Sequence, residues 1–194
     1  MKKLYCYVDG TGQDTKGEIF LVCVVIVRPE TKEKVEHDLL EIEPKIGKKT
    51  KWISTRPPKR LEYLERILNL KALQRNLFFG IYKGSTEYLN LATETIIKAI
   101  QSSTREPYQV TVAIDGLNRT QREKIKRLLK AGGIKYRKVQ GPSWRSNPFI
   151  RLADALAGFS RAANERKLYS QELFDRFVRK GFLNEVKNKT ARLS

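Results

Sequence analysis

Two aspartates stand at the ends of apolar runs, where a buried core would not place a carboxylate. Asp9 directly follows Tyr5–Val8, and Asp115 directly follows Val112–Ile114. Both runs are typical of buried strands, and ligands of open α/β sheets bind beyond the carboxyl ends of the strands. We therefore expect the two carboxylates to meet in one cleft. The alternative is that each Asp-Gly pair only forms a turn after its strand.

A third aspartate interrupts an apolar helical segment. Asp154 lies within Phe149–Phe159, in which three alanines and Gly158 would let the helix approach a sheet closely. An unpaired buried carboxylate is costly, so an inward-facing Asp154 needs a cation nearby. If Asp154 instead lies on an exposed stripe of the helix, Arg151 can be its partner.

Asp9, Asp115 and Asp154 together define a candidate catalytic and metal-binding set. Carboxylate ligands without histidine or cysteine suit a hard cation, Mg²⁺ or Mn²⁺. Such an ion beside a nucleic acid supports hydrolysis or transfer of phosphodiester bonds. Clustered like charges also repel one another, so at least one of the three carboxyl groups should have a raised pKa when no metal is bound.

The scarcity of histidine and cysteine argues against other site chemistries. The chain contains one histidine, His37, and two cysteines, Cys6 and Cys23. These are too few for a zinc site, and no evident nucleophile lies near His37 for a catalytic triad. Because both cysteines lie in apolar runs, we expect reduced core residues. His37 is expected to be a solvent-facing residue of a strand.

The chain of 194 residues has 39 Lys+Arg and 21 Asp+Glu residues, a net charge of +18. Residues 44–60 carry +7 and residues 119–151 carry +10, so the excess is concentrated in two windows. Such a field attracts polyanions, of which nucleic acid is the commonest large one. The expected nucleic-acid contacts are Lys48, Lys49, Lys51, Arg137, Lys138, Arg145 and Arg151.

Part of this charge can belong to ordinary solvated surface. Residues 122–130 have the pattern of a solvated helix face. Trp52 and Trp144 lie inside the two charged windows and would either stack on bases or belong to the core.

The apolar segments are too short for a membrane anchor. Ile19–Val27, the longest apolar run, has nine residues, fewer than a bilayer-spanning helix needs. The amino-terminal segment reaches Asp9 before an apolar stretch of signal-peptide length can form. We therefore expect a cytoplasmic protein without a membrane partner.

Alternating and β-branched runs predict strands that would position the carboxylates. Residues 4–8 and 18–28 form a predicted hairpin across a glycine-rich turn. Residues 34–42 are predicted to form a third strand. Later strands are predicted over 77–82, 109–114 and 134–139.

Capping residues and prolines predict where the helices begin. A helix is expected to begin at Pro57-Pro58, and Ser85 is expected to cap the next. Asn118 and Gln121 predict a capping box. The last two helices are expected to begin at Asn147-Pro148 and at Ser170. Together these elements predict one mixed sheet covered by helices, an α/β domain over residues 1–183, followed by a flexible basic tail over 184–194.

The order of these motifs resembles the ribonuclease H-like superfamily. Tyr7–Gly12 is similar to the Asp-Glu-[Ser/Thr]-Gly motif that ends the first strand in the domain of unknown function family 3800. Arg151–Gly158 is similar to that family's Gln-x-x-Asp helix motif. Between them, Tyr88–Ile100 and Val110–Gly116 resemble the helix and the aspartate-ending strand of type 2 ribonucleases H. The resemblance spans residues 4–165.

The resemblance implies a ribonuclease H-like mixed β-sheet flanked by helices. It also implies that Mg²⁺ or Mn²⁺ is held by Asp9, Asp115 and Asp154. Two positions depart from the family pattern, since Gly10 replaces a glutamate and Arg151 replaces a glutamine. The resemblance supplies no fourth acid, and the nearby candidates are Asp14, Glu43 and Glu94.

These inferences predict a metal-dependent, nuclease-like protein that acts on DNA or RNA. Because Arg151 lies one helical turn before Asp154, we expect it to contact a substrate phosphate and not to support the core. The alternative is a non-catalytic nucleic-acid-binding protein whose ribonuclease H-like site is degenerate. The sequence leaves the choice between DNA and RNA and the oligomeric state open.

Overall fold

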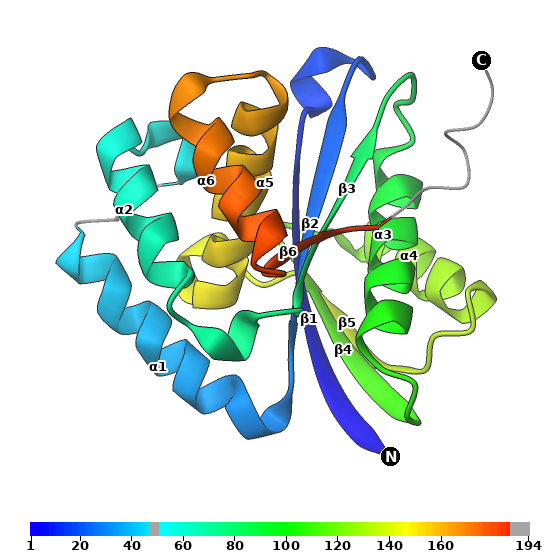
Figure 1. Cartoon of the computed structure of the whole chain (residues 1–194). Coiled ribbons are helices and arrows are strands. Elements are labelled where there is room, and N and C mark those ends of the chain that lie inside the picture. The colour runs from blue at the N-terminus through cyan, green and yellow to red at the C-terminus, as the bar shows by residue number, and fades with distance from the viewer. Residues whose placement is uncertain (47–50, 187–194) are drawn as a thin grey trace.

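A mixed β-sheet forms the centre of the molecule (Figure 1). The computed structural model describes residues 1–46 and 51–186, and within them the sheet has six strands in the order β5-β4-β1-β2-β3-β6. β1 runs antiparallel to β2 and parallel to β4. The strands are β1 (Lys2–Thr11), β2 (Phe20–Val27), β3 (Leu77–Tyr82), β4 (Tyr108–Ile114), β5 (Tyr136–Gln140) and β6 (Leu183–Glu185).

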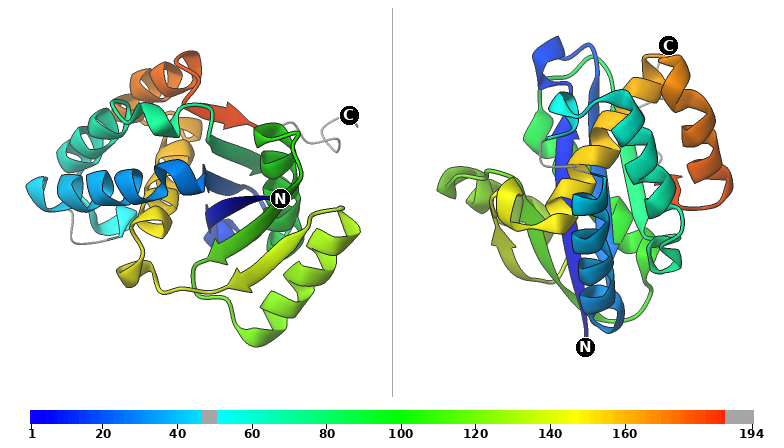
Figure 2. Two further views of the ribbon diagram at one scale, coloured as in Figure 1. Left: turned by 90° about the horizontal axis from the view of Figure 1, so that it is seen from below. Right: turned by 90° about the vertical axis from the view of Figure 1, so that its left-hand side faces the viewer.

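Helices cover both faces of the sheet (Figure 2). One face carries α1 (Pro29–Lys45), α2 (Pro57–Ile67), α5 (Pro148–Asn164) and α6 (Leu168–Arg179). The other face carries α3 (Tyr88–Ser103) and α4 (Arg119–Ala131). The predicted α/β class, with a mixed sheet flanked by helices, is therefore confirmed. None of the helices within the described part of the chain is long and apolar enough to span a bilayer.

β2 lies between two hydrophobic cores, because every one of its residues is buried. Cys23 and Val25 belong to the core beneath α5, whereas Val22 and Val24 belong to the core beneath α3. A strand that is buried on both faces has a continuous apolar sequence, which is why Phe20–Val27 shows no polar alternation. Both cysteines are buried and reduced, as expected.

The register of β1 and β4 places two carboxylates beside each other. The parallel pairing includes Tyr7 opposite Ala113 and ends with Val8 opposite Ile114. One residue further along each strand stand Asp9 and Asp115. Because neighbouring strands lie about 4.8 Å apart, these two residues must be close.

Small residues let α5 lie directly on β1 and β2. Ala153 and Ala157 are buried against the sheet, and Phe149 stacks on Tyr7 of β1 with 4.6 Å between ring centroids. This close packing determines where Asp154 of α5 lies relative to the ends of the strands.

The strand predicted over 34–42 is wrong, because these residues belong to α1. Pro29 suits the first turn of a helix, and Val35, Leu39 and Ile42 recur at helical spacing on the buried side. Lys32 donates to Glu36 one turn later, at 2.8 Å. His37 is exposed, as expected, but it lies on this helix and not on a strand.

The predicted helix starts are correct for α2, α4 and α5 and displaced for α3 and α6. Asn118 and Gln121 form the predicted capping box at the start of α4. α3 begins at Tyr88, and the hydroxyl of Ser85 accepts from the Glu87 N–H in the turn before it. α6 begins at Leu168, two residues before Ser170.

The chain remains ordered beyond residue 183, where the flexible tail was predicted to begin. Leu183–Glu185 forms β6, which pairs in parallel with β3 from Leu77 to Phe79. The Asn184 side-chain amide donates to the Leu77 carbonyl at 3.0 Å. The rest of the predicted tail, from residue 187 on, lies outside the described residues.

If β6 is an integral part of the fold, Leu183→Ala should lower the free energy of unfolding by about 2–4 kcal/mol, because Leu183 is 1% exposed in the core. Leu40→Ala is the matched control, since Leu40 is 50% exposed on α1 and should cost about 0.5 kcal/mol or less. Denaturant unfolding of the two variants measures both costs. Equal losses in the two variants would contradict the placement of β6.

Candidate carboxylate site

The structure brings Asp9, Asp115 and Asp154 together at the carboxyl ends of β1 and β4. Asp9 points to the same face of the sheet as Tyr7, the face covered by α5. The charges of Asp154 and Asp115 both act on the Asp9 carboxyl group. We call these three residues the carboxylate cluster.

The backbone amides of Gly10 and Trp52 and the Lys51 ammonium contact the cluster. Gly10 N–H donates to Asp9 Oδ1 at 2.9 Å, and Trp52 N–H donates to Asp154 Oδ2 at 2.9 Å. Lys51 Nζ donates to Asp115 Oδ2 at 3.2 Å. The sequence predicts a phosphate contact for Lys51, whereas the structure pairs its ammonium with a carboxylate. Nothing in the sequence near Asp154 indicated the contact from Trp52, which is 102 positions away.

The pKa of Asp9 reports how crowded the cluster is. Burial, followed by the negative charge of Asp154, raises the pKa of Asp9 from its usual 3.8 to about 7. Asp115 adds a smaller increase, whereas the Gly10 hydrogen bond and the charge of Lys51 oppose the rise. This agrees with the expectation that one carboxyl group of the set binds a proton more readily than a free aspartate does.

The donor types suit Mg²⁺ or Mn²⁺, but their present arrangement does not form a finished metal site. Within residues 1–46 and 51–186, no group of three His, Cys, Asp or Glu residues is arranged to hold an ion. The Lys51 ammonium instead contacts the cluster through Asp115.

The three candidates for a fourth acid each pair with a basic side chain. Asp14 accepts from Arg161 at 2.8 Å, and Glu94 pairs with Lys98 one turn along α3. Glu43 pairs with Arg151. The charges that shift the pKa of Asp9 come instead from Asp154, Asp115 and Lys51.

Arg151 pairs with Glu43 and is placed as a structural residue would be, whereas its predicted phosphate contact stays a prediction. Its side chain is 12% exposed and Glu43 is 8% exposed. Arg151 Nε lies 2.9 Å from both Glu43 carboxylate oxygens, and Nη2 lies 2.7 Å from Oε2. Nη1 donates to the Arg145 carbonyl at 2.9 Å. The pair with Glu43 lies where α1 and α5 pack together.

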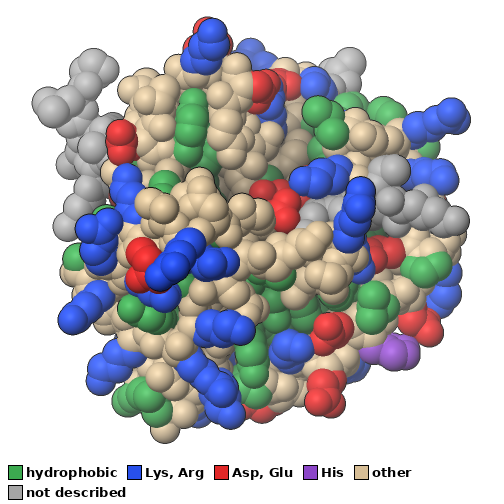
Figure 3. All heavy atoms as spheres, turned by 180° about the vertical axis from the view of Figure 1, so that it is seen from behind, with side chains coloured by type: hydrophobic (Ala, Val, Ile, Leu, Met, Phe, Trp, Pro, Cys, Tyr) green, Lys and Arg blue, Asp and Glu red, His purple; other side chains and the backbone are tan. Residues whose placement is uncertain are grey.

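The remaining predicted nucleic-acid contacts divide into exposed residues and residues that the structure does not describe. Arg137 and Lys138 on β5, and Arg145 in the turn Trp144–Ser146, are exposed. Lys48, Lys49 and the side chain of Trp144 lie outside the described residues. Seen from the face opposite to that of Figure 1, Lys and Arg side chains are spread over the surface, with scattered acidic side chains between them and one acidic group near the centre (Figure 3).

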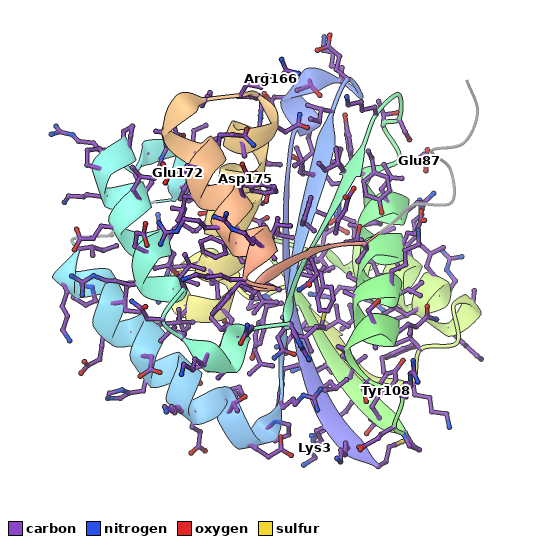
Figure 4. All side chains as sticks on the ribbon, viewed as in Figure 1. Lys3, Glu87, Tyr108, Arg166, Glu172 and Asp175 are labelled. Atoms are coloured by element: carbon purple, nitrogen blue, oxygen red, sulfur yellow. The ribbon has the colours of Figure 1, made fainter. Side chains whose placement is uncertain are left out.

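A cleft of about 490 Å³ adjoins the cluster on the α3 and α4 side of the sheet. Asp9, Asp115 and Glu87 line it. Glu87 lies at the amino end of α3 (Figure 4). Lys124 of α4 lies 3.9 Å from Glu87 across the cleft. Sequence analysis missed Glu87, because a single acid before a helix is indistinguishable from an ordinary cap.

The fold is similar to solved structures of type 2 ribonucleases H. Ribonuclease H2 from Pyrococcus horikoshii OT3 aligns over 87% of this chain and 77% of its own, with a TM-score of 0.52 and 13% identity. The PCNA:RNase HII complex from Archaeoglobus fulgidus contains a chain that aligns over 100% of this chain and 96% of its own, with a TM-score of 0.52 and 13% identity. At this identity the likeness establishes a ribonuclease H-like fold and nothing finer. Neither a protein-family model nor a curated protein matches the sequence, so the resemblance to family 3800 stays a prediction.

The raised pKa of Asp9 predicts a pH-dependent stability. Between about pH 4 and pH 7 the folded protein binds a proton on Asp9 that the unfolded chain has released, so the free energy of unfolding falls as the pH rises through this window. Asp9→Asn removes this loss. In EDTA, its stability relative to wild type should therefore increase by about 2–4 kcal/mol from pH 4 to pH 8. Denaturant unfolding at the two pH values measures the difference, and parallel pH profiles would contradict the assignment.

The Arg151–Glu43 pair predicts a large cost for a substitution that restores the family residue. Arg151→Gln should lower the free energy of unfolding by about 3 kcal/mol or more, because it leaves the Glu43 carboxylate buried without its partner. Arg145→Gln is the exposed control and should cost about 0.5 kcal/mol or less. Thermal and denaturant unfolding compare the two. A loss for Arg151→Gln no larger than that of the control would favour the phosphate-contact hypothesis.

Proposed function

We propose that this protein is a metal-dependent nuclease that hydrolyses or transfers phosphodiester bonds in DNA or RNA. The observation that carries the proposal is the carboxylate cluster at the strand ends of a ribonuclease H-like sheet. Its crowding, expressed in the pKa of Asp9, is what a divalent cation would relieve. The basic surface around it supplies the attraction for a polyanion.

Asp9, Asp115 and Asp154 are the residues that would hold Mg²⁺ or Mn²⁺. A bound ion supplies an activated water and stabilises the departing oxygen of the phosphodiester. Arg137, Lys138 and Arg145 are exposed and would hold the nucleic-acid backbone, as would Lys48 and Lys49. A cytoplasmic location belongs to the same proposal.

A non-catalytic nucleic-acid-binding protein is the second candidate. It is favoured by one observation, that the described residues form no group of three arranged to hold an ion, while Lys51 contacts the cluster. In that case the basic surface would bind nucleic acid and the carboxylates would have only a structural role.

Cleavage assays with labelled single-stranded DNA, RNA and DNA–RNA hybrid separate the two candidates. The wild-type protein should cleave at least one substrate with Mn²⁺ or Mg²⁺ and none in EDTA. Asp115→Asn should reduce cleavage about a hundredfold or more, because it removes a ligand of the ion while preserving the side-chain shape.

Binding measured in EDTA is the control for these assays. Asp115→Asn should bind the same substrates as tightly as wild type, whereas Arg137→Ala with Lys138→Ala should bind more weakly with a shallower dependence on salt. Binding by the wild type without cleavage under any metal condition would establish the second candidate. Failure to bind any of the substrates would contradict both.

A further inference from the structure

The segment Lys51–Thr55, which we call the strap, lies against the carboxylate cluster. Its first two residues contact two different members of the cluster. Lys51 Nζ lies 3.2 Å from Asp115 Oδ2, and Trp52 N–H donates to Asp154 Oδ2 at 2.9 Å. The strap therefore connects the end of β4 to α5 across the cluster.

The Trp52 indole anchors the strap to α5. Trp52 is 5% exposed and packs against Phe159 with 6.3 Å between ring centroids. A Cβ added to Gly158 would lie 2.0 Å from Trp52 Cδ1, so only glycine leaves room for the indole. Gly158 follows Asp154 by one helical turn. The Trp52 ring therefore packs one turn away from the carboxylate that accepts from the Trp52 backbone N–H.

Arg60 of α2 clamps the same segment from the other side. Its guanidinium lies over the Trp52 ring, 4.8 Å from the centroid. Arg60 Nε donates to the Trp52 carbonyl and Nη2 donates to the Ile53 carbonyl, each at 3.1 Å. The strap is thus held by contacts that do not involve the Lys51 ammonium.

The Lys51 side chain is the movable part of this fixed segment. It is 52% exposed, and its stem is a flexible chain of four carbons. The ammonium nevertheless acts electrostatically on all three carboxylates, since Asp115, Asp9 and Asp154 each interact with its charge. An ammonium and a divalent ion both need the same carboxylate oxygens, so they compete for them.

We propose that Lys51 is a built-in competitor for the cation of the carboxylate cluster: its ammonium neutralises the cluster when no metal is bound, and a divalent ion binds as this side chain swings into solvent. This inference rests on the proposed function for the role of the ion. It also accounts for the arrangement of the cluster, in which the carboxylates contact the Lys51 ammonium and the backbone amides of Gly10 and Trp52 and do not form a finished metal site.

Mn²⁺ binding in the absence of nucleic acid tests the competition. Calorimetric titration with Mn²⁺ of the full chain compares wild type with Lys51→Met and with Lys59→Met, which removes the same charge from an exposed position on α2. Lys51→Met should bind Mn²⁺ about fivefold to tenfold more tightly than wild type, the effect of one charge at about 4 Å in a well-solvated site. Lys59→Met should bind as wild type does. Equal or weaker binding by Lys51→Met would overturn the proposal.

Thermal melting in EDTA at pH 8 tests the neutralising role without metal. Lys51→Met should melt at a lower temperature than Lys59→Met, because the three carboxylates lose their counter-charge. Adding Asp115→Asn to Lys51→Met should recover part of the loss, because it removes one of the repelling charges. An unchanged melting temperature for Lys51→Met would overturn this role.

The two measurements separate this inference from the proposed function. Mn²⁺ binding that is the same in wild type and Lys51→Met overturns the competition and leaves the nuclease proposal intact. If none of the three proteins binds Mn²⁺, both the nuclease proposal and the competition fail, and the melting data alone decide whether Lys51 neutralises the cluster.

Discussion

Parallel pairing of β1 with β4 places Asp9 next to Asp115, and the repulsion between carboxylates is the constraint that the surrounding structure meets. The backbone cannot relax this repulsion, because the register is fixed by the buried residues that precede both aspartates. α5 adds a third negative charge from the same face. In the part of the chain that the structure describes, protonation of Asp9 and the Lys51 ammonium can each offset this charge, and a bound ion would be a third way. A proton, the Lys51 ammonium and an ion compete for the same carboxylates. The pH, the position of the Lys51 side chain and metal binding are therefore linked at this edge of the sheet.

The scaffold that imposes this constraint is apolar and independent of the site. β2 is buried along its whole length, and two hydrophobic cores hold the sheet from both sides. Alanines on α5 allow the helix to approach the sheet, so the packing of α5 determines where Asp154 lies. A substitution within the cluster should therefore change charge and binding without changing the fold, whereas a substitution in α5 changes both.

The sequence predicted the parts of the site that depend on short-range patterns. Asp9 and Asp115 could be identified because each directly follows an apolar run. The end of such a run can be recognised in the sequence without knowing which strands pair with it. Over residues 34–42 the sequence pattern is compatible with a strand or a helix, because only a few apolar residues, such as Val35, Leu39 and Ile42, stand among charged ones. The packing of α1 against α5 favours the helix. Contacts across a hundred positions, such as Glu43 with Arg151 or Trp52 with Asp154, leave no local signal in one sequence.

Arg151 and Lys51 show why the net charge of a window does not reveal what its members bind. Both were expected to contact phosphate, and both lie beside carboxylates. Arg151 meets one acid, Glu43, in a site where both side chains are nearly buried, so its charge is neutralised and fixed. Lys51 interacts electrostatically with three carboxylates, so its single positive charge does not balance theirs. Because the side chain is half-exposed, it can move into solvent. Burial and the local ratio of charges thus separate a structural cation from an exchangeable one, whereas Arg137 and Lys138 of β5 are exposed.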